Sequence, residues 1–366
     1  MRKKLISILL ILVVFISGAC RSDPAPELPG GLADPSGAAP YIPDAANTPT
    51  RFRAVFFELF DTVTIVMGYA DSQQEFDYYT GVIHSELYRL HMLFDIFHEY
   101  PGVSNIRTIN QNAGVAPVEV DPVIIELIQL SKQAYRSTNG SVNIALGPVL
   151  GIWHTHRNAP NPALPDMAEL LAANEFTSID DVIVDEENST VFLRREGMSL
   201  DVGTIGKGFA IELAAHRAID AGFESFLLNV GGDVFAANAP PGRDFWNVGV
   251  EDPNLDDQNI VDVVAASSLA VFSSGDYRRY FVVDGVSYSH LIDPQTLTPA
   301  VRYRAVTVIH PRAAYAEILS TAAFIMDLDS ATALLEDYGA QAIWILDDGQ
   351  TFTTPGYETL SGGSVG

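Results

Sequence analysis

The sequence predicts an α+β fold of mixed or antiparallel sheets with flanking helices, built as one large or two modest domains. Strand-like and helix-like segments are intermixed along the chain, without the steady alternation that a doubly wound parallel sheet requires. Apolar residues make up 48% of the 366 residues, and aromatic residues are plentiful. The chain can therefore form a large core, and a disordered protein is excluded.

Acidic side chains dominate the composition, and the formal net charge is −25. Binding to nucleic acid phosphates needs clustered Lys and Arg, so a nucleic-acid-binding function is excluded. Loose electrostatic attachment to an anionic lipid surface is disfavoured for the same reason.

The N-terminus has the pattern of a bacterial lipoprotein signal peptide at 1–20. Basic residues at 2–4 precede an apolar run at 5–16, which is too short to span a bilayer comfortably. Small residues then lead to Cys20, the only cysteine, which we predict to be the acylated first residue of the mature protein. An ordinary signal peptide, cut near Ala19, is the alternative. The predicted location is the extracytoplasmic side of a bacterial membrane, with a lipid anchor.

A folded body follows a flexible tether. Residues 21–50 are rich in Pro, Ala and Gly and show no apolar period, so they predict an extended linker, and the domain is placed at 51–360. The predicted elements are a strand at 54–68 interrupted by Asp61, helices at 74–97, 121–138, 166–173, 206–221, 313–326 and 329–338, a polar irregular segment at 105–112, and strands at 182–184, 190–193, 226–230, 248–251, 261–265, 269–273, 306–310 and 341–345.

A predicted hairpin at 273–299 ends in two polar side chains. Asp284-Gly285 is a strong hairpin turn signal, and the second strand ends at His290 and Asp293, just before Pro294. A rigid strand end suits an imidazole and a carboxylate that must be held still. The alternative is an ordinary hairpin with a solvated His and a capping Asp.

Two glycine-rich corners could bind a ligand. The Asp-Val-Gly-Thr-Ile-Gly-Lys-Gly segment at 201–208 closes a strand and opens a helix, where free N–H groups and Lys207 suit an anion. It is neither a Walker A loop nor a GxGxxG fingerprint, and a plain helix start is the alternative. The Asn-Val-Gly-Gly-Asp segment at 229–233 lets backbone approach a ligand or merely another strand.

Glu317 and Thr321 are four residues apart and share one face of a predicted helix. A carboxylate and a hydroxyl there could hold Mg²⁺, with waters and phosphate oxygens completing the shell. The alternative is an ordinary surface pair.

The histidines carry less information. His84, His91 and His98 are spaced by seven and fall on one predicted helix face, too far apart to share a metal. His154 and His156 follow a tryptophan in a predicted loop, and a zinc pair there is a minor alternative.

Taken together, these segments resemble the FAD:protein FMN transferase (ApbE) family. The resemblance covers roughly 51–356 and rests on ordered motifs at 201–208, 229–233, 274–280, 289–296 and 316–321, with a further similar segment at 135–153. It implies a single large, T-fold-like domain that binds FAD and Mg²⁺ and transfers FMN to a threonine or serine hydroxyl of a partner flavoprotein, releasing AMP. The partners implied are subunits of Rnf-type or sodium-pumping NADH:quinone oxidoreductase membrane complexes.

The resemblance also assigns residues. Metal ligands would be Thr204, Glu317 and Thr321, with Ser320 close by. The residues that would line FAD are Phe60, Phe97, Ser141, Val142, Asn143, Asp201, Lys207, His290, Leu291, Ile292 and Asp293. A base must accept the proton of the incoming hydroxyl, and His290 or Asp293 is the hypothesis.

The chain departs from the family pattern at four places. The usual metal-binding Asp is Glu317, the early Met-Gly-Thr reads Phe-Asp-Thr at 60–62, the Phe-Asp-x-Thr segment reads Val-Asn-Ile-Ala at 142–145, and a Thr-Gly reads Thr-Leu at 296–297. Two further functions therefore stay open: an FAD pyrophosphatase that yields FMN and AMP, and a lipoprotein that binds FAD without chemistry.

Overall fold

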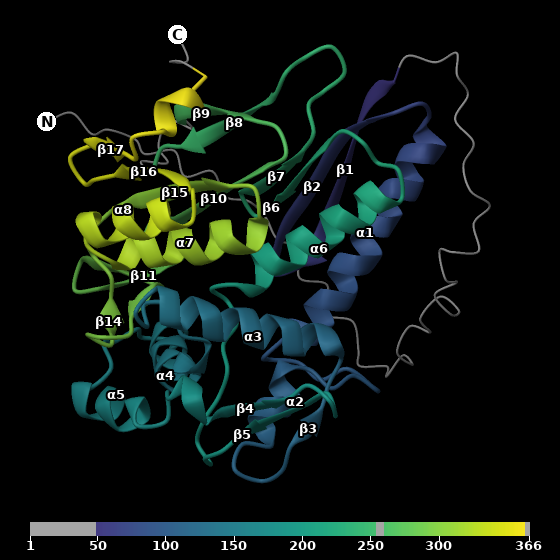
Figure 1. Cartoon of the computed structure of the whole chain (residues 1–366). Helices are drawn as coiled ribbons and strands as arrows, with labels where there is room; N and C mark the ends of the chain where they lie inside the picture. Colours follow the sequence, from purple (N-terminus) through teal and green to yellow (C-terminus); the bar gives the residue numbers. More distant parts are fainter. Residues whose placement is uncertain (1–48, 254–259, 363–366) are drawn as a thin grey trace, which may run out of the picture. The chain divides into compact units, whose positions relative to one another are not determined.

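An eight-stranded antiparallel sheet organises the chain (Figure 1). The computed structural model describes residues 49–253 and 260–362. In order across the sheet, the strands are β1 (Thr50–Leu59), β2 (Thr62–Ala70), β6 (Phe226–Val230), β7 (Asp233–Ala237), β10 (Leu269–Gly275), β15 (Ala305–His310), β16 (Gln341–Ile345) and β17 (Thr351–Thr353). The predicted fold class, mixed or antiparallel sheets with flanking helices, is confirmed.

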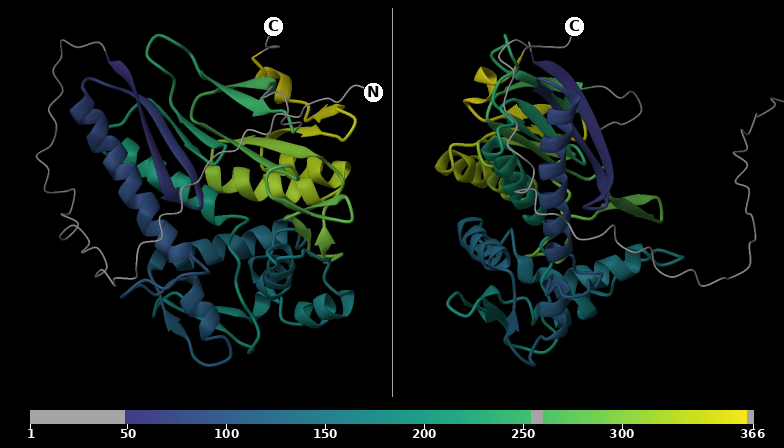
Figure 2. Two further views of the ribbon diagram at one scale, coloured as in Figure 1. Left: turned by 180° about the vertical axis from the view of Figure 1, so that it is seen from behind. Right: turned by 90° about the vertical axis from the view of Figure 1, so that its right-hand side faces the viewer.

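Four helices, numbered α1, α6, α7 and α8, pack on one face of this sheet. The eight α-helices of the described residues are α1 (Gln73–Phe94), α2 (Ile106–Gln111), α3 (Pro122–Ser137), α4 (Gly147–Arg157), α5 (Met167–Asn174), α6 (Gly206–Asp220), α7 (Ala313–Ile325) and α8 (Leu328–Asp337). Helix α1 runs along β1 and β2, and α7 lies against β10 and β15 (Figures 1 and 2). Alternate strand residues point to this face, so the large core includes the buried Phe226, Phe272 and Trp344.

Smaller sheets complete the fold. These are β3 (Val118–Glu119), β5 (Thr190–Leu193) and β4 (Val182–Asp185) in one sheet, and the pairs β8 (Trp246–Glu251) with β9 (Ile260–Ala266), β11 (Tyr280–Val283) with β12 (Val286–Ser289), and β13 (Ile292–Asp293) with β14 (Thr298–Pro299). The β8–β9 hairpin covers the second face of β7, β10, β15 and β16 and builds a second core, which includes Trp246, Val271 and Ile343.

Most predicted elements form, and the differences have local causes. The single strand predicted at 54–68 is the hairpin β1–β2, because Phe60 and Asp61 both adopt positive φ near 52°. The predicted irregular segment at 105–112 is α2, because the side chains of Asn105 and Thr108 form a capping box.

Two histidine assignments are wrong. Helix α1 ends at Phe94, so His98 lies beyond it and the three spaced histidines do not share one helix. His154 and His156 lie on helix α4 and not in a loop. His156 contacts the carbonyl of Ala163, and the described residues contain no group of three or more His, Cys, Asp or Glu side chains that could hold a metal ion.

The predicted signal peptide with Cys20 lies outside the described residues, as does the tether up to residue 48, so these remain predictions. Among the helices that the structure does describe, none has the length and apolar character needed to cross a membrane.

Candidate functional site

A cavity of about 1790 Å³ lies where the start of α6, the end of β10, α7 and the β1–β2 turn come together. The predicted site residues that line it are Phe60, Phe97, Ser141, Asn143, Asp201, Thr204, Lys207, His290, Leu291, Ile292, Glu317, Ser320 and Thr321. Segments that are far apart in the sequence therefore meet at one site.

Two predicted residues do not line this cavity. Val142 is buried in the main core. Asp293 uses its carboxylate to accept the N–H of Gln295 at 2.8 Å, which stabilises the turn between β13 and β14. Asp293 thus has a structural role in this conformation.

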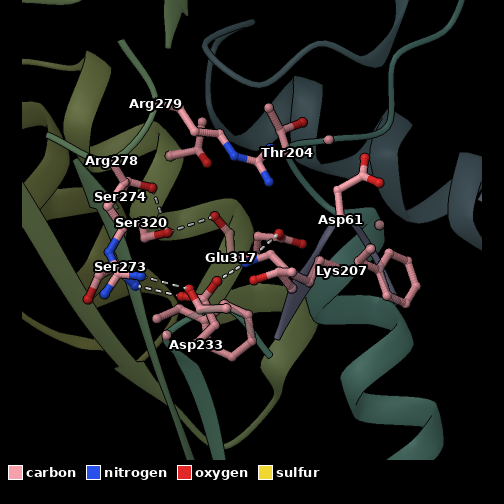
Figure 3. Close-up of a pocket in the computed structure, with 18 of the residues that line it drawn as sticks. Asp61, Thr204, Lys207, Asp233, Ser273, Ser274, Arg278, Arg279, Glu317 and Ser320 are labelled. Carbon is pink, nitrogen blue, oxygen red and sulfur yellow. Dashed lines mark hydrogen bonds and ion pairs between the residues drawn. The ribbon is translucent and has the colours of Figure 1, made fainter. Parts of the chain in front are cut away.

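Lys207, Asp233 and Glu317 form an ionic cluster at the centre of the cavity (Figure 3). The Nζ of Lys207 forms an ion pair with Asp233 and lies 3.7 Å from Oε1 of Glu317. The second carboxylate oxygen of Glu317 accepts the N–H of Gly208 at 2.6 Å. A Cβ at Gly208 would lie 2.8 Å from Cβ of Glu317, so only glycine lets α6 approach α7 this closely.

Burial shifts the pKa values of Glu317 and Lys207. It raises the pKa of Glu317 and lowers the pKa of Lys207, and the attraction between the two groups opposes both shifts. A cation close to Glu317 therefore favours the ionised form of its carboxylate.

Thr204 carries an unsatisfied polar atom at this site. Its Oγ1 is buried and has no hydrogen-bond partner among the described residues. A buried hydroxyl without a partner is costly, so a ligand is the natural explanation. The hydroxyl of Thr321 and the carboxylate of Glu317 add oxygen donors, a set that suits Mg²⁺ when phosphate and water oxygens complete the shell.

Ser320 is less available as a ligand. Its hydroxyl lies 3.0 Å from that of Ser274 and also donates to the carbonyl of Glu317 at 3.0 Å (Figure 3). The bond with Ser274 ties α7 to the end of β10, so Ser320 orients the helix that carries Glu317.

His290 is a neutral imidazole in this structure. Burial, together with the positive charge of Arg279, lowers the pKa of His290 to about 4. Its Nδ1 lies 3.0 Å from the carbonyl oxygen of Arg279, which can only accept, so Nδ1 carries the proton. The Nε2 atom is then left as an acceptor.

Asp95 fixes a turn that lines another part of the cavity. Its carboxylate accepts the N–H groups of Phe97 and His98 and the hydroxyl of Tyr100, at 2.6 to 3.1 Å. The carbonyl of Phe97 accepts from Arg107 at 2.8 Å. The exposed ring of Phe97 is thereby presented to the cavity as an aromatic wall.

The departures from the family pattern have different consequences. Asp61 stands in a left-handed turn, where glycine is less strained. Asn143 donates to the carbonyl of Thr177 at 3.0 Å and accepts from the N–H of Ala145 at 2.9 Å, so its amide is occupied by the fold. Leu297 also adopts a positive φ of 61°, and its buried side chain packs beside Trp153.

Sequence reasoning missed Asp233, Arg279 and Asp95 as site residues. Asp233 and Arg279 line the cavity and lie in two of the motifs that carry the family resemblance, at 229–233 and 274–280. A charged side chain in a glycine-rich or turn segment could have indicated them as site residues. Asp95 was missed because its hydrogen-bond partners, although close in the sequence, are brought to its carboxylate only by the folded turn.

Comparisons with known proteins agree with this geometry. The sequence model of the ApbE family matches residues 61–344. The FAD:protein FMN transferase of Treponema pallidum is 33% identical over 261 residues, covering 67% of this chain and 71% of that protein. One from Klebsiella pneumoniae is 31% identical, covering 63% and 71%.

Solved structures show the same fold. The ApbE protein of Thermotoga maritima superposes with a TM-score of 0.77 at 29% identity, over 85% of this chain and 99% of that one. The flavin transferase ApbE of Vibrio cholerae has a TM-score of 0.73, over 86% and 100%, and at 22% identity it supports the fold alone.

Proposed function

This chain belongs to the ApbE family, and we propose that it is a Mg²⁺-dependent FAD:protein FMN transferase that joins FMN to a threonine or serine hydroxyl of a partner flavoprotein. The transfer of FMN from FAD rests on the activity named for its relatives. The observation that supports the metal is the buried, unpartnered hydroxyl of Thr204 in the cavity that Glu317 also lines.

The reaction breaks the pyrophosphate bond of FAD. The acceptor oxygen bonds to the phosphorus of the FMN half, AMP leaves with the bridging oxygen, and the hydroxyl proton needs an acceptor. When bound at Thr204, Glu317 and Thr321, Mg²⁺ would neutralise charge that develops on the phosphates. The neutral His290 can accept the proton at Nε2, because Nδ1 is engaged by Arg279.

Purified protein with FAD, Mg²⁺ and a threonine-bearing acceptor protein tests this function. Transfer yields flavin fluorescence on the acceptor in a denaturing gel. Release of FMN and AMP without labelled acceptor would instead identify a pyrophosphatase, and bound FAD without turnover would identify a binding protein. Chelation of Mg²⁺ should abolish transfer.

Replacement of Thr204 by valine separates a metal ligand from a structural residue. Valine is nearly isosteric and removes an unsatisfied buried hydroxyl, so the melting temperature should be unchanged or higher. We expect kcat/KM to fall about 10- to 100-fold, with a higher Mg²⁺ concentration needed for half-maximal rate. Unchanged Mg²⁺ dependence in a folded Thr204→Val variant would contradict the assignment.

The proposed role of His290 predicts the acid limb of the pH profile. At saturating Mg²⁺, which favours ionised Glu317 despite its raised pKa, kcat/KM should stay level from about pH 7 to 5. It should fall as the pH drops through about 4, where protonation of His290 removes the base. Arg279→Gln removes a positive charge that lowers this pKa, so the acid limb should move to higher pH. An acid limb that does not move would argue against His290 as the base.

We further propose that acylated Cys20 anchors the protein to the membrane on the extracytoplasmic side. Acceptors would be flavoprotein subunits of membrane redox complexes of the Rnf or sodium-pumping NADH:quinone oxidoreductase type. Cys20→Ala should move the protein from the membrane fraction to the soluble fraction of cells, and an unchanged distribution would refute the anchor.

A further inference from the structure

Strand β8 presents a free edge to the cavity. The sheet of β8 and β9 has two strands only, so one edge of β8 has no neighbouring strand among the described residues. The consecutive residues Asn247, Val248 and Gly249 all line the cavity, although the side chain of Val248 is buried in the core. The backbone of β8 therefore borders the cavity.

The pairing of β8 with β9 shows which backbone N–H and C=O groups of β8 point away from β9. Asn247 pairs with Ala265, whose N–H bonds to Leu360 on the far side of β9. Gly249 pairs with Val263, whose carbonyl accepts from Gly362, also on the far side. Both are therefore non-hydrogen-bonded pairs, and the N–H and C=O groups of Asn247 and Gly249 point away from β9.

The two N–H groups donate, and the two C=O groups accept, no backbone hydrogen bond within the part of the chain that the structure describes. Asn247 and Gly249 are two residues apart, and a strand added to an edge forms its hydrogen bonds at every second residue. Exposed edges of this kind bind extended peptides by strand addition, with main-chain bonds giving affinity.

The free edge leads toward the ionic cluster. Glu251, at the end of β8, forms an ion pair with Arg278, and Arg278 also donates to the carbonyl of Gly231 at 3.2 Å. Gly231 lies two residues before Asp233, which pairs with Lys207. A chain bound along β8 would thus run toward the site where the acceptor hydroxyl must react.

The floor of this part of the cavity is apolar. It is formed by half-buried side chains of β2 and β6 on the face not covered by helices, Ile65, Met67 and Leu227. The whole cavity, at about 1790 Å³, exceeds the roughly 300–1,000 Å³ of ordinary small-molecule sites. Room therefore remains for a second substrate beside FAD.

We propose that β8 binds an extended, hydroxyl-bearing segment of the acceptor protein as an added strand, with its alternate apolar side chains on the floor formed by Ile65, Met67 and Leu227. This inference rests on the proposed transfer of FMN to a protein. It assigns acceptor recognition to main-chain bonds at Asn247 and Gly249, outside the groups that hold FAD.

The decisive variant is Asn247→Pro. Proline removes one outward N–H and blocks close strand approach, yet leaves the β8–β9 bonds intact because this N–H points away from β9. Thr353→Pro on β17 is the matched control. The N–H of Thr354 bonds to Ala342, so that of Thr353 points away from β16, and Thr353 does not line the cavity.

The probe is a displayed library of random peptides with a fixed central threonine, selected with the unaltered protein, FAD and Mg²⁺ for covalent flavin fluorescence. Selected peptides are then assayed in solution. We expect Asn247→Pro to lower kcat/KM for the peptide about 10-fold or more, with the affinity for FAD unchanged within about twofold. Thr353→Pro should leave both values unchanged.

Three results would overturn the inference. The first is an equal kcat/KM for the peptide in Asn247→Pro and in the unaltered protein. The second is an equal loss of kcat/KM in both proline variants. The third is transfer to a folded acceptor protein while no peptide is modified. Absence of any FAD turnover with peptides and with folded proteins would instead refute the proposed function itself.

Discussion

Replacement of Glu317 by glutamine is expected to lower the rate of FMN transfer by about 100- to 1000-fold, the range seen when a single preorganised electrostatic group is removed from an active site. Glutamine keeps the shape of the side chain and can still accept the N–H of Gly208. Lys207 keeps its ion pair with Asp233, so the fold should tolerate the change. The measurement is kcat/KM for labelling of an acceptor across a Mg²⁺ titration.

Glu212→Gln is the matched control. Glu212 is another buried carboxylate, on α6, and it accepts from Arg312 and from the N–H of Ala314. Its replacement should lower the melting temperature without a specific loss of Mg²⁺ dependence, because it does not line the cavity. Glu317→Asp keeps the charge and should retain more activity than Glu317→Gln. Equal losses in these two Glu317 variants would contradict a charge-based role.

The site residues that could be predicted from the sequence lie in segments with local sequence signals. Thr204 lies in a glycine-rich corner, Glu317 in a segment with helical spacing, and His290 in a hairpin with a recognisable turn. The family resemblance then assigned all three to one site, and all three line the cavity. Local signals also predicted where helices begin, as at α3, where Asp121 is the N-cap before Pro122.

Some local structure and the ionic pairing in the cavity could not be predicted in this way. The capping box of α2 was outweighed by a polar composition that suggested an irregular segment. The role of Asp95 depends on a turn that folds back onto its carboxylate. Lys207 was expected to face the ligand directly, and only the folded chain shows that it also neutralises Asp233.

Lys207→Met is expected to lower the free energy of unfolding by about 3–5 kcal/mol, the usual consequence of removing one partner from a buried ionic group. The side chains of Asp233 and Glu317 are only 8% and 7% exposed, so both carboxylates would lose their nearest cation. Urea unfolding in a chelator measures the loss. Lys207→Arg keeps the charge and should lose less.

A double variant tests whether the loss is electrostatic. In Lys207→Met combined with Glu317→Gln, only Asp233 remains as an unpaired buried charge, so the double variant should be more stable than Lys207→Met alone. Simple addition of the two single losses would show that packing of the lysine side chain matters and its charge does not. Mg²⁺ should stabilise Lys207→Met more than the unaltered protein, because a metal ion at Glu317 would then supply the positive charge that Lys207 no longer provides.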